Sequence, residues 1–389
     1  MRAQVDFDYY AVKPVGGDIQ LGWKTLHEGP DMFWTPRNGG HWVVTRAEDI
    51  YDIYRDDERF CTEFVAIPKE EERERKFAPA ERDGAEHLDF RKAIMPLFSP
   101  KAIGLLEEKA RTMSIRLIEE MKPRGHCDYV ADFAAKLPIA IFLSMMDLPL
   151  EDHKLLAPHV DAIARSPDHA AISRAFNTMI DYLDGKIAER AARPGDDALS
   201  HLMRSRINGE PISRDDLLSL SANVMFAGLD TVVAGLSFTA RFLAMHPDHR
   251  RALSGDPEKI PDAIEEILRR HGIANLARTV RHRTEYKGVV LEPGEMILLP
   301  TSLYGLDERR FDDPLSVDFD RSDKRHVAFA VGSHRCVGSH LARMELRVAT
   351  TEWLKRIPDF EVADPDGVVA RSGRLNTLSA LPLRWPAAN

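Results

Sequence analysis

The sequence predicts a mainly α-helical protein with a small β part, and three patterns carry this prediction. Apolar residues recur at helical spacing over 86–270, with proline and glycine between the runs. Residues 284–299 alternate and turn as a β-hairpin does, and the tail at 368–385 is also strand-like. A second helical pattern lies at 338–355, between these two segments. We therefore expect a succession of helices followed by a small sheet.

The remaining elements follow in order along the chain. The N-terminal part contains short strand-like runs such as 42–45, and a charged stretch at 69–76 is interpreted as a solvated loop or helix face. The irregular stretch at 307–332 is long, and such loops in compact domains are usually functional. Proline and glycine divide the helical region at Pro96, Pro100, Pro123, Gly125, Pro149, Pro194, Gly195 and Pro247.

Two apolar stretches are similar in composition to membrane spans, and both are interpreted as buried helices. Residues 137–146 are far fewer than the roughly 20 needed to cross hydrocarbon. Residues 217–238 are numerous enough, but Asn223, Asp230 and Thr231 lie within them, and a central carboxylate costs at least about 2.5 kcal/mol in lipid. We expect a core helix with polar residues in its middle.

Composition narrows the class of protein. The 389 residues are 44% hydrophobic and 30% charged, as in soluble globular proteins. A formal net charge of -9 provides no global basic surface for nucleic acid or anionic lipid. Three cysteines without a CxxC spacing argue against a disulfide framework and a structural zinc site. Without a Gly/Ser- or Pro-rich linker or a secretory signal pattern, we expect one domain over 1–389, located in the cytoplasm.

The segment 329–338, FAVGSHRCVG, is the most informative because it places Cys336 between glycines where a helix begins. Backbone N–H groups and the positive helix end stabilise a thiolate, and glycines let a flat cofactor approach the backbone. A lone cysteine is more often a buried structural residue. The full pattern resembles the haem-thiolate loop of the cytochrome P450 superfamily, except that Ala330 stands where that family usually has glycine.

This resemblance implies a cytochrome P450 fold, with haem b buried between a long central helix and the loop and helix of the cysteine ligand. It implies that Cys336 is the axial iron ligand and that Phe329 packs beside its sulfur. His334 would reach a haem propionate, and Gly338 would lie beside the cofactor. Thiolate ligation donates electron density to the iron and favours O–O cleavage.

A second matching segment, 227–231, reads AGLDT in the predicted core helix. Gly228 costs about 1 kcal/mol relative to alanine in a helix, and Asp230 and Thr231 compete for backbone hydrogen bonds. This local weakness indicates a site, although chance packing of small residues would give the same pattern. The segment resembles the oxygen-activating groove of the superfamily, which implies that Ala227 and Gly228 line the haem. It also implies that Thr231 hydrogen-bonds the dioxygen and that Asp230 relays solvent protons.

Glu266 and Arg269 are three residues apart and therefore share one helix face. In isolation such a pair is most often a surface salt bridge worth a few tenths of a kcal/mol. Here it resembles the family's Glu-x-x-Arg, a buried structural pair behind the haem. The family's third partner is commonly an arginine of the following loop, but aligning 313–319 puts Ser316 there, so the alignment does not complete the triad.

Two further matches concern the propionates of the haem. One is the segment 87–91, HLDFR, at a predicted helix start, and the other is Arg278 just before the hairpin. The fork of an arginine suits a carboxylate, so four residues are candidates for the two propionates. These candidates are His87, Arg91, Arg278 and His334.

The resemblance extends to one branch of the superfamily. Five segments look like the bacterial camphor hydroxylase and its close relatives, which oxidise small terpenoids. They are GLDTVV at 228–233, YGLDER at 304–309, HLAR at 340–343, RIPDF at 356–360 and ALPL at 380–383.

The pocket positions modify what this branch implies for the substrate. Camphor hydroxylase has a tyrosine that donates a hydrogen bond to the substrate carbonyl, and the matching region, 74–79, has none. Asn223 and Phe226 replace aliphatic residues of that branch, which adds one polar amide. We expect a compact, mostly apolar substrate of bicyclic monoterpenoid size, camphor- or cineole-like. The candidate substrate-binding residues are Arg75, Phe77, Asn223, Phe226, the loop residues Ala274 and Leu276, and Leu375 of the tail.

The predicted activity is the insertion of one oxygen atom of O2 into a C–H bond. The sequence contains no flavin or iron–sulfur motif, so we expect a separate 2Fe–2S ferredoxin served by an NAD(P)H-dependent reductase. A basic patch of Arg91, Lys92, Arg335 and Arg343 would attract this acidic partner. Two alternatives are a peroxide-driven peroxygenase, which the Asp230–Thr231 pair disfavours, and a haem-binding sensor without catalysis.

Overall fold

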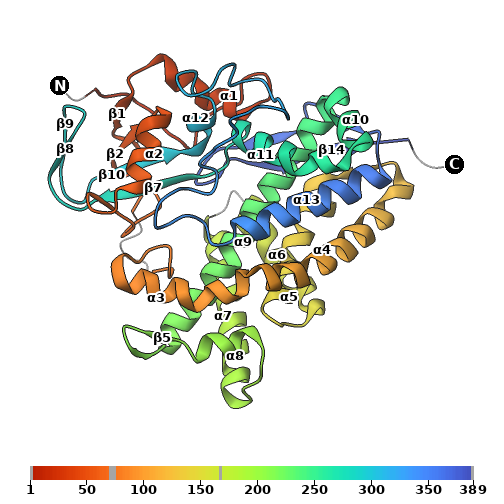
Figure 1. The fold of residues 1–389 in the computed structure, drawn as a ribbon, viewed down its shortest axis with the longest axis horizontal. Coiled ribbons are helices and arrows are strands. Elements are labelled where there is room, and N and C mark those ends of the chain that lie inside the picture. Colours follow the sequence, from red (N-terminus) through yellow and green to blue (C-terminus); the bar gives the residue numbers. More distant parts are fainter. Residues whose placement is uncertain (1–2, 70–75, 166–168, 387–389) are drawn as a thin grey trace.

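The computed structural model describes residues 3–69, 76–165 and 169–386. Helices form most of it, and a smaller β region lies beside them, around the N-terminal segments (Figure 1). The predicted fold class is therefore confirmed. The helices are α1 (Ile19–Lys24), α2 (Ala47–Arg55), α3 (Gly84–Ile94), α4 (Pro100–Met121), α5 (Lys136–Met145), α6 (His153–Arg165), α7 (His169–Ala192), α8 (Ala198–Met203), α9 (Arg214–Met245), α10 (Pro247–Gly255), α11 (Ile260–Arg270), α12 (Thr301–Gly305) and α13 (Ser339–Arg356).

The helices begin and end at the predicted punctuation. Pro100 and Pro247 occupy the first turns of α4 and α10, where the missing N–H has no intrahelical partner to lose. Ser99 caps α4 by accepting a hydrogen bond from the backbone N–H of Ala102 at 3.3 Å. Gly125, at φ 72°, ends the short turn after α4 in the left-handed region that favours glycine. Local sequence thus sets most helix boundaries.

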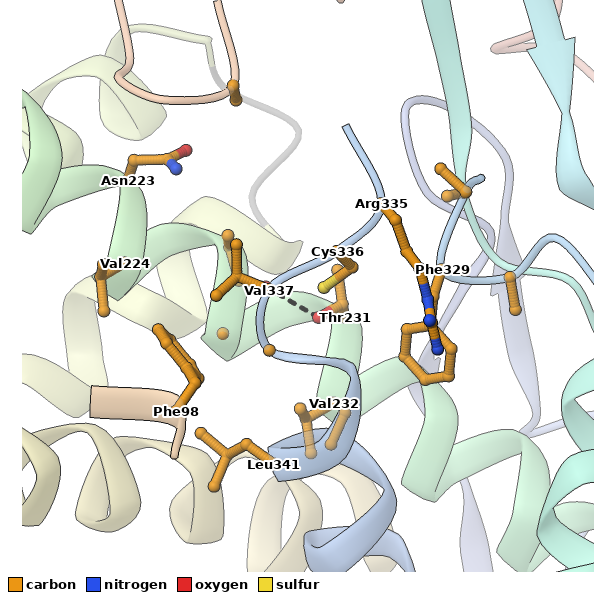
Figure 2. Close-up of a pocket in the computed structure, with 18 of the residues that line it drawn as sticks. Phe98, Asn223, Val224, Thr231, Val232, Phe329, Arg335, Cys336, Val337 and Leu341 are labelled. Atoms are coloured by element: carbon orange, nitrogen blue, oxygen red, sulfur yellow. Dashed lines mark hydrogen bonds between the residues drawn. The ribbon is translucent and has the colours of Figure 1, made fainter. Parts of the chain in front are cut away.

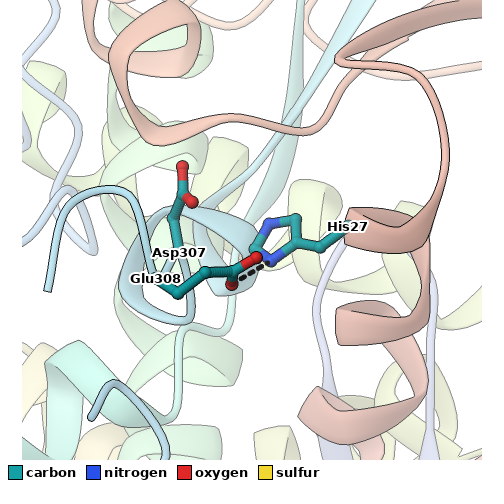
Figure 3. Close-up of side chains that lie close together, drawn as sticks. All are labelled: His27, Asp307 and Glu308. Carbon is teal, nitrogen blue, oxygen red and sulfur yellow. Dashed lines mark ion pairs between the residues drawn. The ribbon is translucent and has the colours of Figure 1, made fainter. Parts of the chain in front are cut away.

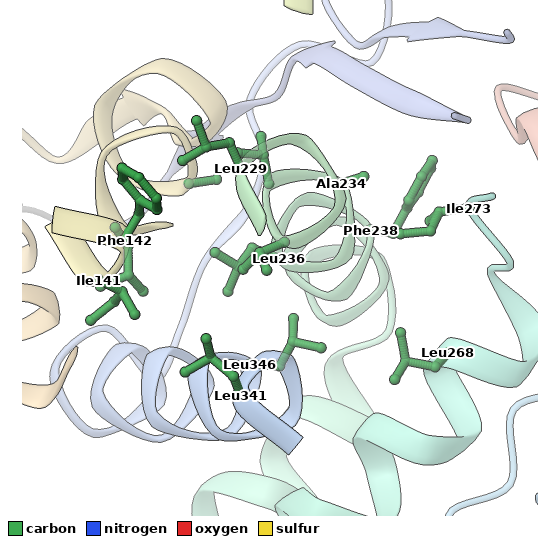
Figure 4. Close-up of a cluster of buried hydrophobic side chains, with 14 of the residues drawn as sticks. Ile141, Phe142, Leu229, Ala234, Leu236, Phe238, Leu268, Ile273, Leu341 and Leu346 are labelled. Atoms are coloured by element: carbon green, nitrogen blue, oxygen red, sulfur yellow. The ribbon is translucent and has the colours of Figure 1, made fainter. Parts of the chain in front are cut away.

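The long helix α9 forms the centre of the helical region. Its start is capped by Ser213, whose hydroxyl accepts from the backbone N–H of Asp216 at 3.0 Å. Side chains of α9 such as Leu229 and Leu236 lie among those of α5, α11 and α13 (Figure 4). Within the described residues, α9 is long and apolar enough to cross a membrane, but 67% of its most apolar window is buried. The expectation of a core helix is confirmed.

The β region is a five-stranded sheet in the order β1-β2-β10-β7-β3. Its pairs are antiparallel except β2 and β10, which run parallel. The predicted loop around Ala274 and Leu276 is instead the start of a strand, β7, because β10 pairs with it from Asn275 onward and the carbonyl of Arg374 accepts from the N–H of Asn275 on the other side. The strands are β1 (Met32–Thr35), β2 (His41–Val44), β3 (Phe60–Cys61), β7 (Asn275–Val280) and β10 (Met296–Pro300).

Smaller β elements complete the fold. Of the hairpin predicted over 284–299, residues 284–291 form it and turn at Lys287 and Gly288, both at positive φ, as a tight two-residue turn requires, whereas residues 296–299 belong to β10 of the larger sheet. The strand-like tail is confirmed, and its residue Leu375 bridges to Ala274 beside β7. Between Leu306 and Gly338 the chain has neither helix nor strand, as expected. The elements are β4 (His126–Asp128), β5 (Arg206–Ile207), β6 (Glu210–Pro211), β8 (Thr284–Tyr286), β9 (Val289–Leu291), β11 (Glu361–Val362), β12 (Val369–Arg371), β13 (Thr377–Ala380) and β14 (Pro382–Arg384).

Candidate active site

A cavity of about 300 Å³ lies between α9, α3, α5 and the loop that precedes α13. Most of its walls are apolar side chains, for example Val232 of α9 and Leu341 of α13 (Figure 2). Residues far apart in the sequence meet here. The predicted site residues that line the cavity are His87, Arg91, Asn223, Ala227, Gly228, Thr231, Ala274, Leu276, Phe329, His334, Cys336 and Gly338.

The loop that carries Cys336 is held in a tight conformation. The backbone N–H of Cys336 donates to the carbonyl of Phe329 at 2.9 Å, which folds the loop back on itself. Gly332 lies at φ 80°, and a Cβ there would be 2.8 Å from the carbonyl oxygen of Tyr54, so glycine is required. Ala330 adopts φ 52°, also in the left-handed region. The loop therefore presents the cysteine just before α13 begins.

The thiol of Cys336 faces the cavity and is accessible through it (Figure 2). The surrounding protein nevertheless desolvates the sulfur, and this desolvation raises the pKa of the thiol. The backbone N–H of Gly338 and the cations Arg91, Arg343 and Arg335 act in the opposite direction and favour the thiolate. A metal ion at the sulfur would complete this stabilisation, since a coordinated thiol loses its proton.

On the opposite wall, α9 presents Thr231 to the cavity. The hydroxyl of Thr231 donates a hydrogen bond to the carbonyl of Ala227 at 2.8 Å, so its oxygen is held on the cavity side of the helix. Asp230 does not line the cavity, and its carboxyl has no hydrogen bond or ion pair with any described residue. Desolvation raises the pKa of Asp230 to about 6. The carboxyl can therefore exchange protons near neutral pH.

The four predicted propionate ligands surround one side of the site, but not identically. His87, Arg91 and His334 line the cavity, and the rings of the two histidines have centroids 4.0 Å apart. His334 also lies 3.2 Å from a carboxylate oxygen of Asp83. Burial lowers the pKa of His87 to about 4, with His334 and Arg91 adding to the effect. His87 is therefore neutral at pH 7, and Arg91 is the guanidinium donor that lines this corner of the cavity.

Arg278 lies behind the cavity on β7 and is almost fully buried. Its guanidinium lies over the ring of Tyr54 at 4.9 Å, and its Nε has no hydrogen-bond partner among the described residues. A buried guanidinium without a carboxylate is costly, unless a bound group supplies one.

Glu266 and Arg269 form the predicted pair on α11, and both are fully buried. The expectation from the alignment at Ser316 is corrected, because Arg321 supplies the third partner and donates to Glu266 at 2.9 Å. Ser316 takes part only through its carbonyl, which accepts from Arg269 at 2.9 Å. The irregular segment turns back between Asp318 and Arg321, so an arginine five positions beyond the aligned serine reaches the pair.

Two predicted pocket residues lie away from the cavity wall, in a cluster of aromatic rings. Phe226 stacks on Phe176 of α7 with centroids 4.3 Å apart, and Phe77 meets Phe176 edge-on at 5.6 Å. None of these rings lines the cavity. Leu375 is likewise placed behind Ala274, and Arg75 lies outside the described residues.

The predicted basic patch is partly neutralised by acidic neighbours. Arg343 forks onto the carboxylate of Glu265 at 2.6 and 2.8 Å, and Lys92 pairs with Asp89 at 3.0 Å. Arg91 donates to the carbonyl of Arg335 at 2.8 Å. Arg91 and Arg335 are therefore the members with uncompensated charge near the cysteine loop.

A buried acid that sequence reasoning missed is Glu345 on α13. It lines the cavity at 2% exposure, and its Oε2 has no hydrogen-bond partner in the described chain. Burial raises the pKa of Glu345 to about 8, so it is mostly neutral at pH 7. The signal that could have found it is an acidic residue on the apolar face of the helix that begins just after Cys336.

His27, Asp307 and Glu308 lie close together outside this site (Figure 3). Lys24 and Arg46 bind the same carboxylates, and the backbone N–H of Ala47 donates to Asp307 at 2.8 Å. The cluster therefore behaves as an ion-pair network that joins the N-terminal segments to the chain after α12.

A cysteine presented to an apolar cavity opposite a Gly-x-Asp-Thr groove has the arrangement that a haem-thiolate site requires. The family model for "Cytochrome P450" matches residues 142–372, and the chain belongs to this family. The structure titled CYP101C1 has a TM-score of 0.91 at 36% identity and covers 99% of this chain and 98% of its own. The structure titled CYP101J2 has a TM-score of 0.90 at 34% identity, with 98% and 97% covered. The steroid C26-monooxygenase of Mycolicibacterium smegmatis is 34% identical over 297 residues, covering 74% of each chain.

The protein is thus an enzyme of the cytochrome P450 family, an oxidoreductase whose cofactor is haem b. The residues present fit this group. Cys336 presents a thiol at one wall of the cavity. The Nε of buried Arg278 has no hydrogen-bond partner among the described residues, and a propionate would supply an acidic acceptor for it. His87 and Arg91 add donors at the same side.

Proposed function

We propose that this cytochrome P450 hydroxylates a compact, mostly apolar molecule of bicyclic monoterpenoid size, camphor- or cineole-like. The observation that carries the proposal is the mostly apolar wall beside Thr231, since the haem itself takes the part of the cavity next to Cys336. Similarity to the CYP101C1 and CYP101J2 structures over nearly the whole chain supports the branch that the sequence resemblance indicates. Residues 1–389 would act as one cytoplasmic domain.

In this proposal Cys336 ligates the iron, and His87, Arg91, Arg278 and His334 hold the propionates. When bound, the haem would supply the O2 chemistry, in which one oxygen atom enters a C–H bond and the other leaves as water, with an electron pair and a pair of protons consumed. Thr231 positions a hydroxyl at the cavity wall, and Asp230 takes up solvent protons at its carboxyl and passes them toward that hydroxyl. Apolar walls exclude bulk water.

We further propose that the electrons come from a separate 2Fe–2S ferredoxin served by an NAD(P)H-dependent reductase. The uncompensated charge of Arg91 and Arg335 beside the cysteine loop favours an acidic partner there, despite the net charge of -9. Reversing the charge of Arg335, which holds no propionate in this proposal, should lower the ferredoxin-supported rate and flatten its salt dependence. An unchanged rate and salt dependence would remove this surface from the proposal.

The first experiment is the absorption spectrum of the reduced protein under carbon monoxide. A thiolate-ligated haem gives the red-shifted Soret band characteristic of the superfamily, and Cys336→Ser should lose that band while still binding haem. Titration with camphor, cineole and a steroid then ranks substrates by the low- to high-spin shift. A spin shift with the steroid alone would contradict the monoterpenoid proposal.

Thr231→Ala separates the proposed monooxygenase from its alternatives. A monooxygenase should keep consuming ferredoxin electrons but release them as peroxide instead of product. A peroxide-driven peroxygenase should keep its peroxide-supported rate in the variant, and a sensor should show no substrate turnover in either protein. Product per electron, measured with and without added peroxide, distinguishes the three.

A further inference from the structure

Asn223 is a polar side chain without a partner at the cavity. It lies on α9, is half-buried, and its amide makes no hydrogen bond with any residue in the described ranges. In Figure 2 the amide extends from the helix toward the space between α9 and the cysteine loop. An amide in a mostly apolar wall lacks the hydrogen bonds it would have in water, so a ligand that supplies one is favoured.

Other polar groups along this wall are already engaged. The hydroxyl of Thr231 donates to Ala227, and Thr301 both donates to the carbonyl of Ala274 and accepts from its N–H. The Tyr54 hydroxyl donates to the carbonyl of Leu299. Among these groups, Asn223 alone offers free donors to a molecule in the cavity.

The spacing of residues along α9 places Asn223 and Thr231 on the same face of the helix. Asn223, Ala227 and Thr231 are at i, i+4 and i+8, so they follow one face of the helix, and the first and last are about 12 Å apart along its axis. Ala227 and Gly228 between them are small and leave that stretch of wall open. A compact molecule held at Asn223 therefore extends along α9 toward Thr231.

We propose that Asn223 determines specificity by donating a hydrogen bond to a single acceptor oxygen, a ketone or ether, of an otherwise apolar bicyclic substrate. The oxygen-bearing end is held at Asn223, and the opposite end of the skeleton is presented beside Thr231 for oxidation. This inference rests on the proposed function and names the substrate class of the same site.

The test compares camphor with bornane, the hydrocarbon of the same skeleton without the carbonyl, by spin-state titration of the haem-loaded protein. The wild type should bind camphor more tightly than bornane. Asn223→Leu removes the donor, and Asn223→Asp removes it at matched size. Both variants should lower the ratio of camphor affinity to bornane affinity roughly five- to tenfold, and Asn223→Leu should leave bornane binding unchanged or tighter.

Val224→Ala is the matched control, because Val224 lines the same cavity on the same turn of α9 without a polar group. It should weaken both probes by the same factor. Product analysis supplies a second readout, since loss of the anchor should turn one main camphor product into a mixture.

Two outcomes would overturn the inference, and they are distinguishable. If the wild type binds both probes but the camphor-to-bornane ratio survives in both Asn223 variants, Asn223 is not the anchor, and the proposed function stands. If neither probe shifts the spin state of a wild type that gives the carbon monoxide band, the proposed substrate class fails as well.

Discussion

Ala330 occupies a backbone conformation that alanine rarely adopts, at φ 52° in the loop that presents Cys336. An L-residue in the left-handed region costs about 1 kcal/mol or more, partly offset by the greater freedom of glycine in the unfolded chain. Ala330→Gly should therefore raise the free energy of unfolding by about 0.5 kcal/mol, measured by denaturant titration. Ala328→Gly, at an ordinary φ in the same loop, should lower it, and equal effects would contradict the strain.

The carboxyl of Asp230 should make the stability of the folded chain depend on pH. Desolvation raises its pKa from 3.8 to about 6 in the folded chain, so the neutral carboxyl favours folding. Below about pH 3.8 this contribution is fully present, and it is lost as the pH rises through 6. Asp230→Asn should therefore raise the melting temperature more at pH 8 than at pH 4. A difference independent of pH would contradict the shifted pKa.

Glu345 should behave similarly at higher pH, because burial raises its pKa from 4.5 to about 8. The neutral form stabilises the folded chain at low pH, and this contribution disappears as the pH rises through 8. Glu345→Gln should gain stability relative to the wild type on the order of 4 kcal/mol between pH 5 and 9. Thermal melts across this range test it, and a gain complete by pH 6 would argue against a neutral Glu345 at pH 7.

At the scale of elements, the aromatic cluster joins α7 to α9 and to the chain before α3. Phe176 contributes both contacts, the stack on Phe226 and the edge-on contact with Phe77. Such ring pairs are worth about 1 kcal/mol each beyond their buried area. Phe176→Ala should lower hydrogen-exchange protection of α7 roughly fivefold or more and speed substrate association in stopped-flow titration. Asn177→Ala, exposed on the same helix, is the control and should change neither quantity.

At the scale of the whole molecule, Arg321 connects the irregular chain between α12 and α13 to the buried pair on α11. Glu266 has no exposed surface, so removal of one guanidinium leaves its charge poorly compensated. Arg321→Ala should lower the free energy of unfolding by about 3 kcal/mol, measured by denaturant titration. Arg325→Ala, at a side chain 82% exposed, should cost under about 1 kcal/mol. A similar small cost for Arg321→Ala would show that the triad adds little.

Local patterns in the sequence were sufficient for the features that depend on near neighbours. The spacing of Cys336 among its glycines, the Asp230–Thr231 pair and the boundaries of the long helices each depend on a few consecutive residues or on helical periodicity. The structure places Cys336 and Thr231 on one cavity, although 105 positions separate them in the sequence. The family assignment therefore followed from segments that are individually short.

The tertiary structure decided what depends on contacts between distant segments. Arg321, and not the residue aligned at Ser316, donates to Glu266, because the turns of the backbone determine which arginine reaches that carboxylate. The tertiary structure also made a strand of the segment after Ala274, because β3 and β10 pair with it. It raised the pKa of Glu345 and left Asn223 without a partner, since burial and hydrogen-bond satisfaction are properties of the packed surroundings and not of the neighbouring residues.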